Sequence, residues 1–380
     1  NVHADHHSLW INPKNPNHLV NGNDGGINIS YDDGENWIKN NSPSVGQFYA
    51  INIDNEKPYN VYGGLQDNGT WMGSSQTREN YDWFDSGHNP YTMINGGDGM
   101  QVQIDTRDNK TIYSGSQFGA YSRQNLVTKE RKSVRPSRDL GETALRYNWQ
   151  TPILLSRHNQ DVFYYGSNKF HRSLNRGDSL VTLSADLTSN PAQGDVPFGT
   201  LTTMSESPIK FGLIYVGSDD GNVQVTKDGG YTFSLLNKGL PKGLYVSRVV
   251  ASAFNEARVY VTLNGYRNDH FNAYVYRSDD YGTTWKQIMK DLPIEPVNVI
   301  KEDVINENVL YVGTDGGLYV SMDGGNSSMM WNKGLPASVP VHDIVIHPRD
   351  NEIIIGTHGR SLYIAKLEAL QKAAASKAKK

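Results

Sequence analysis

The chain reads Ser278-Asp279-Asp280-Tyr281-Gly282-Thr283-Thr284-Trp285, a pattern S/T-x-D-x-G that ends in an aromatic residue. Related phrases occur at 30–37, 226–233 and 321–328, and the last three copies begin 52 and 43 residues apart. Such a phrase suits a tight hairpin, because the hydroxyl and the carboxylate can accept backbone N–H groups while glycine takes a positive φ. The recurrence predicts a repeat architecture.

The residues that we expect to build these hairpins have a structural role. They are Ser30, Asp32, Gly34, Trp37, Thr226, Asp228, Gly230, Ser278, Asp280, Gly282, Trp285, Ser321, Asp323 and Gly325.

A second phrase, G-x-x-x-G or a shortened form of it after an apolar strand, identifies units in which the first phrase has decayed. Each is preceded by a candidate innermost strand, such as Leu9-Trp10-Ile11 or Ile344-Val345-Ile346. Repeats of this length, with four strands each, are typical of propeller blades. The eight units begin near His7, Phe48, Gly99, Pro152, Thr200, Val246, Pro296 and Val341.

The sequence therefore predicts an all-β propeller of four-stranded blades, with eight repeat units in seven or eight blades and a short C-terminal helix. We assign residues 1–366 to the propeller and 367–380 to an Ala/Lys-rich tail, an exposed short helix or disordered segment. The last unit lacks an outer strand after Tyr363, so we expect it to be incomplete or completed by a partner segment.

Composition excludes several classes of function. Lys and Arg number 36 against 40 Asp and Glu, without a basic stripe, which argues against nucleic acid as a partner. There is no cysteine, so disulfides and thiolate metal sites are excluded, and no apolar run is long enough to span a membrane. The chain opens on Asn1 without a signal peptide, as expected for a processed or excerpted piece.

The repeated phrases resemble the BNR or Asp-box repeats of sialidases, two-propeller xyloglucanases and the sortilin (VPS10) family over nearly the whole chain. Residues 6–13, 63–69 and 356–361 are similar to large secreted BNR-repeat proteins of Bacteroidetes, which carry glycosyl hydrolase or sortilin-like labels. The resemblance implies a location outside the cell or at the outer-membrane surface of a Gram-negative bacterium. It also implies that the chain continues from, or packs on, an N-terminal propeller.

In a four-stranded blade the S/T-x-D-x-G hairpin and the G-x-x-x-G turn lie on opposite faces of the ring. We therefore expect ligands on the face of the second turn, around the channel, where carboxylates, amides and aromatic rings gather. Part of this collection follows from the turn chemistry of Asp and Asn alone. The candidate ligand-binding residues are Asp24, Gln66, Asp67, Asn68, Trp71, Asp219, Asp220, Tyr266, Arg267, Asp315, His358 and Arg360.

A glycosidase needs two carboxylates that face each other about 5 to 10 Å apart. Asp5, Asp67 and Asp219 are the catalytic candidates, with Asp5 facing either of the others across the channel. Xyloglucanases have an acidic residue just before their first-strand phrase, but alignment on Leu9 places Ala4 there. Asp5 lies one position after the aligned site.

No cofactor is expected, although a structural divalent cation such as calcium is compatible with the Asp/Gly turns. His3, Asp5 and His7 are weak metal candidates, because alternate residues of an extended strand share one face.

Three functions remain open. The first is a secreted or cell-surface module that binds protein or glycan through its channel face, within a longer multi-propeller chain. The second is a glycoside hydrolase that uses paired carboxylates on that face. The third is a structural subunit of an outer-membrane or secretion assembly, attached through its tail or its incomplete last blade.

Overall fold

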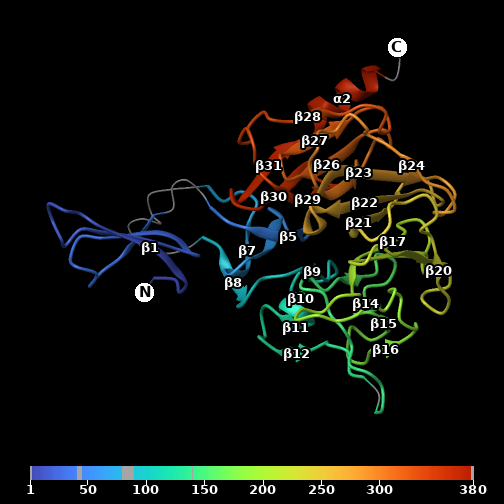
Figure 1. The fold of residues 1–380 in the computed structure, drawn as a ribbon, viewed down its shortest axis with the longest axis horizontal. Helices are drawn as coiled ribbons and strands as arrows, with labels where there is room; N and C mark the ends of the chain where they lie inside the picture. The colour runs from blue at the N-terminus through green and yellow to red at the C-terminus, as the bar shows by residue number, and fades with distance from the viewer. Residues whose placement is uncertain (1, 41–44, 79–89, 139, 378–380) are drawn as a thin grey trace.

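The computed structural model describes residues 2–40, 45–78, 90–138 and 140–377. The chain forms eight antiparallel sheets, and the strands of each sheet pair in the order in which they occur along the chain (Figure 1). Seven sheets have four strands and the last has three, and one helix follows it. The predicted all-β propeller with a short C-terminal helix is confirmed.

The strands of the first four sheets have the following bounds. They are β1 (His6–Ile11), β2 (Leu19–Asn23), β3 (Gly26–Ser30) and β4 (Ile38–Asn40); β5 (Phe48–Ile53), β6 (Asn60–Leu65), β7 (Gly69–Ser74) and β8 (Thr92–Asn95); β9 (Gln103–Ile104), β10 (Thr111–Ser116), β11 (Ala120–Asn125) and β12 (Arg131–Ser133); and β13 (Ile153–Leu155), β14 (Phe163–Gly166), β15 (Phe170–Ser173) and β16 (Val181–Thr182).

The remaining elements complete the chain. They are β17 (Leu201–Glu206), β18 (Ile214–Ser218), β19 (Val223–Thr226) and β20 (Ser234–Leu235); β21 (Tyr245–Ala251), β22 (Val259–Gly265), β23 (His270–Ser278) and β24 (Lys286–Gln287); β25 (Val297–Glu302), β26 (Leu310–Thr314), β27 (Leu318–Ser321) and β28 (Met329–Met330); β29 (Val341–His347), β30 (Glu352–Thr357) and β31 (Leu362–Lys366); the short 3-10 helices η1 (Gln117–Gly119) and η2 (Tyr266–Asn268); and α2 (Glu368–Lys377).

Seven of the sheets form a closed ring. The buried apolar side chains form seven clusters, each shared by two neighbouring sheets from β5–β8 round to β29–β31. Phe48, Ile51 and Val61 of the second sheet pack with Ile354 of the last, and so close the ring. No residue of these seven clusters belongs to the first sheet, so seven blades surround the channel.

The first sheet, β1–β4, lies outside the ring as an arm (Figure 1). All six residues of β1 are exposed, and Leu9, Trp10 and Ile11 keep 58%, 49% and 52% of their surface in contact with solvent. The prediction that Leu9-Trp10-Ile11 is an innermost strand of the ring is therefore wrong. The apolar run resembles that of a blade strand, but none of the seven apolar clusters covers it.

Polar side chains join the innermost strands of neighbouring blades. Asn52 Nδ2 donates to Val102 O at 2.8 Å, and Ser247 Oγ donates to Val297 O at 2.7 Å. At the closing interface, Asp343 Oδ2 accepts the N–H of Ile51 at 2.9 Å. Each bond satisfies a backbone group of the adjacent strand, so the apolar interfaces are held in register by hydrogen bonds.

The tail is less exposed than predicted. Helix α2 follows β31, and Leu367 and Ala374 are buried against the cluster shared by the last two blades. Gln371 Nε2 donates to both carboxylate oxygens of Asp303, at 3.2 and 3.0 Å. One face of the helix is thus part of the core, because its apolar residues recur at helical spacing.

The S/T-x-D-x-G hairpins lie at the turns between the third and fourth strands. Ser278 Oγ donates to Asp280 Oδ1 at 2.7 Å and accepts the N–H of Gly282 at 2.8 Å, while Asp280 Oδ1 accepts the N–H of Thr284 at 2.9 Å. Hydroxyl and glycine bonds of the same kind occur at Ser30 and Gly34, Thr226 and Gly230, and Ser321 and Gly325.

A fifth hairpin of this type has asparagine in place of aspartate. Ser173 Oγ donates to Asn175 Oδ1 at 2.7 Å and accepts the N–H of Gly177 at 2.8 Å, and Asn175 Oδ1 accepts the N–H of Ser179 at 2.9 Å. The pattern S/T-x-D-x-G does not include this copy, because it requires aspartate at the third position. The pattern S/T-x-D/N-x-G includes it.

We predict that ring closure depends on the carboxylate of Asp343. Asp343→Ala should lower the free energy of unfolding by about 1–3 kcal/mol, because the buried N–H of Ile51 loses its acceptor. Urea unfolding followed by tryptophan fluorescence measures the change. Asp343→Asn retains an oxygen for Ile51 and should recover part of the loss; equal stability of the alanine variant and the natural chain would contradict the prediction.

Hydrogen bonds from the side chain and the backbone N–H of Thr284 lower the pKa of Asp280 from 3.8 to about 2. Because the folded pKa is depressed, the stabilisation is complete above the ordinary pKa and is lost as the pH falls from about 4 to about 2. We expect Asp280→Asn to lower the Tm at pH 7, and the difference from the natural chain to shrink over this range. Melting curves at pH 7, 4 and 2 test this, and a gap that stays constant with pH would refute it.

Candidate functional site

The turns between second and third strands lie around one mouth of the channel. Gln66 N donates to Gln47 O at 2.9 Å, Asp219 N to Thr200 O at 3.0 Å, and His358 N to Pro340 O at 2.9 Å. Each acceptor lies just before an innermost strand, so these turns and the strand entries share one face. We call it the turn face.

Close backbone packing fixes the first of these turns. A Cβ on Gly64 would lie 2.2 Å from Met100 O, so glycine is required where the sheet β5–β8 meets the sheet β9–β12. Asp67 has a φ of 58°, and its N–H donates to Asp98 Oδ1 at 2.6 Å. The turn thereby holds Asp67 against the entry to the next blade.

Aromatic rings form an arc on the turn face. His342 stacks on His358 with ring centroids 4.4 Å apart, and His358 lies 5.6 Å from Tyr49. Trp149 Nε1 donates to the hydroxyl of Tyr49 at 3.3 Å, and the Trp149 ring meets Phe118 edge-on at 5.1 Å. These contacts link the last blade of the ring to its first three.

A second arc continues from Asn148. Asn148 Oδ1 accepts the hydroxyl of Tyr245 at 3.3 Å, and the guanidinium of Arg267 lies over Tyr245 and Tyr266, 4.8 and 4.5 Å from the ring centroids. Trp149 and Tyr266 remain 40% and 43% exposed. We call the rings of both arcs the aromatic collar. Its members are Tyr49, Phe118, Trp149, Tyr245, Tyr266, His342 and His358.

Burial determines the charge of the collar. It lowers the pKa of His342 to about 3 and also lowers the pKa of His358, so both imidazoles are neutral at pH 7. It raises the pKa of Tyr49 and of Tyr245 to about 12, so both hydroxyls stay protonated. Among the described side chains, the buried Nδ1 of His358 has no hydrogen-bond partner. The collar is an uncharged aromatic surface beside Arg267 and Arg248, whose Nη2 donates to His342 O at 3.2 Å.

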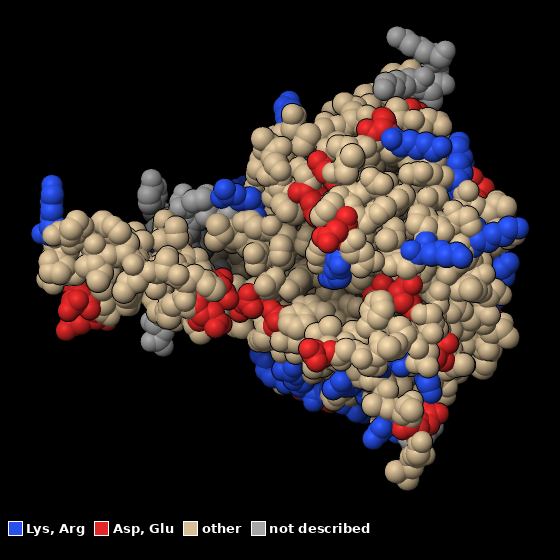
Figure 2. Space-filling view, in the orientation of Figure 1, with Lys and Arg blue, Asp and Glu red and all other residues tan. Residues whose placement is uncertain are grey.

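A group of carboxylates borders the collar where the arm joins the ring. Burial raises the pKa of Asp67, and the nearby carboxylates of Asp98 and Asp24 raise it further. Figure 2 shows acidic side chains gathered at this junction. Asn68 Nδ2 donates to Asp24 O at 2.9 Å and to Gln66 O at 3.0 Å, and Gln66 Oε1 accepts the hydroxyl of Tyr49 at 3.0 Å.

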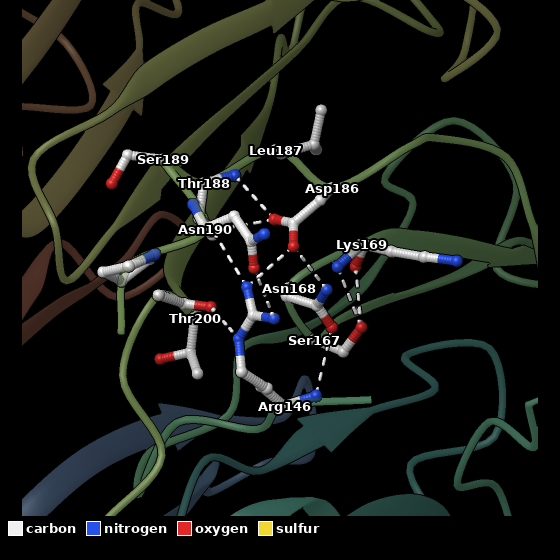
Figure 3. A network of polar contacts seen from close by, with 12 residues as sticks. Arg146, Ser167, Asn168, Lys169, Asp186, Leu187, Thr188, Ser189, Asn190 and Thr200 are labelled. Atoms are coloured by element: carbon white, nitrogen blue, oxygen red, sulfur yellow. Dashed lines mark hydrogen bonds and ion pairs between the residues drawn. The ribbon is translucent and has the colours of Figure 1, made fainter. Parts of the chain in front are cut away.

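A network around Arg146 holds the connection between β16 and β17 over the turn face (Figure 3). Arg146 Nη2 donates to Asp186 Oδ2 at 2.7 Å and Nε to Gly199 O at 3.1 Å, while Asn168 Nδ2 donates to the same Asp186 oxygen at 2.9 Å. Gly199 precedes Thr200, whose hydroxyl accepts a hydrogen bond from Asn148 Nδ2 at 2.9 Å. The network thereby connects to the residue before Trp149.

Asp219 and Asp220, two of the predicted ligand-binding carboxylates, accept hydrogen bonds from residues near this network. Asp219 is buried and accepts the N–H and the hydroxyl of Thr200 at 2.8 and 2.5 Å, and burial raises its pKa. Asp220 accepts the N–H and the hydroxyl of Ser189, both at 2.6 Å, and a hydroxyl bond from Ser218. The geometry gives both side chains partners within the chain.

The other predicted ligand-binding residues are dispersed. Asp315 Oδ1 accepts from Asn298 Nδ2 at 2.8 Å, next to the channel. Trp71 and Arg360 line a groove at the seam between the second and last sheets rather than the collar. Trp71 Nε1 donates to Asn68 O at 2.6 Å.

The metal candidates at the start of the chain have separate partners. His3 Nε2 lies 3.1 Å from Asp67 O, whereas His7 Nε2 lies 2.6 Å from Asp24 Oδ1. Asp5 is exposed and has a φ of 56°. Within the described residues, no group of three or more His, Cys, Asp and Glu side chains is placed to hold a metal ion.

The sequence did not single out Lys301, which lies on β25. Burial and the nearby Arg157 lower the pKa of Lys301 to about 8. Arg248 is also on an innermost strand, and its Nη2 pairs with Asp343 Oδ1 at 3.0 Å. A lysine within the otherwise apolar innermost strand VNVIKE is the sequence signal that could have indicated it.

Comparison with known proteins finds the fold but no family. No protein-family model and no curated protein matches the chain. Among solved structures, the GH74 xyloglucanase from Xanthomonas campestris is similar with a TM-score of 0.60 and 16% identity, over 84% of this chain and 52% of that one. The extracellular domain of the putative one-component system BT4673 from B. thetaiotaomicron gives 0.56 and 17%, over 85% and 38%.

The chain therefore spans about half of the xyloglucanase and less of the second protein. No helix among the described residues is long and apolar enough to cross a membrane. At these identities the likeness shows the fold alone, a β-propeller.

Proposed function

We propose that this chain is a glycan-binding propeller module and that its ligand lies on the aromatic collar. The observation that carries the proposal is the pair of exposed rings, Trp149 and Tyr266, at 40% and 43% exposure on a face otherwise rich in hydrogen-bonding groups. Sugar rings present apolar C–H faces and polar edges, and aromatic side chains with polar neighbours complement both.

The contacts within the collar support a pre-formed site. Trp149 is held by Tyr49 and Phe118, and Tyr266 by Arg267, so little conformational freedom is lost when a ligand binds. Neutral His342 and His358 place no net charge under the ligand. Asp67, Asp98 and Arg267 supply hydrogen-bonding groups at its border.

We further infer that the module works outside the cell, at the surface of a Gram-negative bacterium. The similar extracellular domain of BT4673 and the similar xyloglucanase favour an extracellular, glycan-related setting. We also assign the repeats to the BNR or Asp-box class of the sortilin-like proteins. The hydrogen bonds of Ser278, Asp280 and Gly282 support this assignment.

We predict that Trp149→Ala and Tyr266→Ala each weaken glycan binding about three- to tenfold, because a stacked aromatic ring contributes about 0.5–1.5 kcal/mol beyond its buried area. Calorimetric titration with xyloglucan and other neutral oligosaccharides measures the affinities. Tyr231→Ala is the matched control, because Tyr231 is 65% exposed on the hairpin face and stacks on Arg172. Equal losses in all three variants, or no binding by the natural chain, would refute the proposal.

A glycoside hydrolase is the second candidate function. It is favoured by the raised pKa of Asp67, which burial and two neighbouring carboxylates produce, because a general acid needs such a shift. A reducing-end assay on the same oligosaccharides, beside the calorimetric titrations, distinguishes the two functions. Release of reducing ends that Asp67→Asn abolishes would establish hydrolysis, whereas binding without products would leave the binding module.

We also propose that the first sheet packs on a second propeller within a longer chain. Trp10, Ile27 and Ile38 lie on one face of this sheet, because Trp10 pairs with Val20, Val20 with Ile29 and Ile29 with Ile38. All three side chains are at least 44% exposed. An apolar face of this kind indicates a packing surface. The chain covers only about half of the similar xyloglucanase, which leaves room for another such unit.

Hydroxyl-radical footprinting tests this placement. Trp10 should be modified strongly in the 380-residue chain and at least several-fold less in a chain that also carries the second propeller. A packed indole ring loses its contact with solvent. Tyr231 lies on the hairpin face and should react equally in both. Equal modification of Trp10 in the two forms would contradict the packing.

A further inference from the structure

The last sheet of the ring has an open edge. Strand β31 pairs with β30, and among the described residues no strand pairs with its other side, whereas every other sheet has a fourth strand. An unpaired edge presents a row of free N–H and C=O groups to its surroundings.

The register identifies the groups that face outward. Leu367 N donates to Asn351 O and Thr357 N donates to Ser361 O, so Ser361, Tyr363, Ala365 and Leu367 form the hydrogen-bonded pairs with β30. In an antiparallel ladder the alternate residues point the other way. Leu362, Ile364 and Lys366 therefore direct their N–H and C=O groups toward the open side.

A groove of about 1880 Å³ runs along this edge. Its lining includes β31 itself and, from the neighbouring blade, Tyr59, Trp71 and Arg78. Leu362 and Ile364 pack toward that blade, whereas Tyr363 and Ala365 pack toward the blade on the other side. An added strand would place alternate side chains against the same two neighbours.

The charge of the groove indicates what it accepts. Six of its lining residues are Lys or Arg and three are Asp or Glu, on a chain whose net charge is −4. Arg349 pairs with Asp350 and Lys366 with Glu352. In the described part of the chain, Lys57, Arg78 and Arg360 make no ion pair. A negatively charged strand would complement them.

We propose that the outer edge of β31 is an acceptor site for an extended, acidic peptide segment, which binds as the fourth strand of the last blade. Backbone hydrogen bonds to Leu362, Ile364 and Lys366 hold the peptide antiparallel to β31, as the fourth strands lie in the other blades. Apolar side chains of the peptide face Tyr59 and Trp71 of the neighbouring blade, and its carboxylates complement the excess of Lys and Arg over Asp and Glu in the groove. This is peptide recognition by strand addition.

Fluorescence polarisation with three labelled heptapeptides tests the site. One alternates Val and Glu, one alternates Val and Lys, and one carries a central proline in the Val/Glu sequence. We expect the first to bind at least tenfold more tightly than the others, because it alone combines the required charge with an unbroken strand. Equal affinities for all three peptides would overturn the proposal.

Two variants separate strand pairing from simple charge attraction. Arg360→Glu should weaken the Val/Glu peptide roughly fivefold and favour the Val/Lys peptide, while Lys333→Glu, outside the groove, should change neither. Ile364→Pro removes an outward N–H and should abolish binding. A melting curve shows whether the Ile364→Pro variant folds. If it does not fold, the change in peptide affinity of Arg360→Glu still tests the site.

Hydrogen exchange supplies the direct readout. The amides of Leu362, Ile364 and Lys366 should exchange quickly in the free protein and slow at least tenfold with the Val/Glu peptide, whereas those of Tyr363 and Ala365 are already bonded to β30. Binding without protection at these three amides would mean ionic adsorption and would overturn strand addition. The outcome is independent of the glycan proposal, since none of the collar residues lines the groove.

Discussion

The structure depends on the contact of β29 and β30 with β5, which closes the ring. Phe48 and Ile51 pack against Ile354 there, and Asp343 accepts the N–H of Ile51. Closure lets each of seven blades bury both faces, so that no sheet of the ring has to expose an apolar surface. The first sheet shows the alternative, because it lies outside the ring and leaves Leu9 and Ile11 exposed.

Closure also assembles the collar. Tyr49 and His342 lie nearly 300 positions apart in the chain, yet His358 contacts both. A ring places the turns between second and third strands on one face whatever their distance in sequence, so residues from five blades meet at one mouth of the channel. The collar is therefore a product of the fold as a whole, and the buried histidines are neutral because neighbouring blades exclude water from them.

The sequence predicted those features that local chemistry determines. Hairpins such as 278–285 form their hydrogen bonds within five residues, and the units could be counted from them. Packing between distant segments cannot be predicted from local patterns. Leu9-Trp10-Ile11 is as apolar as Ile344-Val345-Ile346, and only the neighbouring sheets make the first strand exposed and the second buried. Tyr266 and His358 of the collar were recognised singly, whereas the contacts among the collar residues depend on the ring. Lys301 was missed because its environment comes from other blades.

The seam at which the ring closes is also where the chain enters it from the arm. Gly46 O accepts from both Gly359 N and Ser361 N, so the entering chain pairs with the turn before β31. In a regular blade a fourth strand would precede this entry, but β4 pairs with β3 in the arm instead. The first sheet thus keeps the strand that would otherwise cover β31. The pairing of β4 with β3 therefore accounts both for the arm outside the ring and for the open edge of β31.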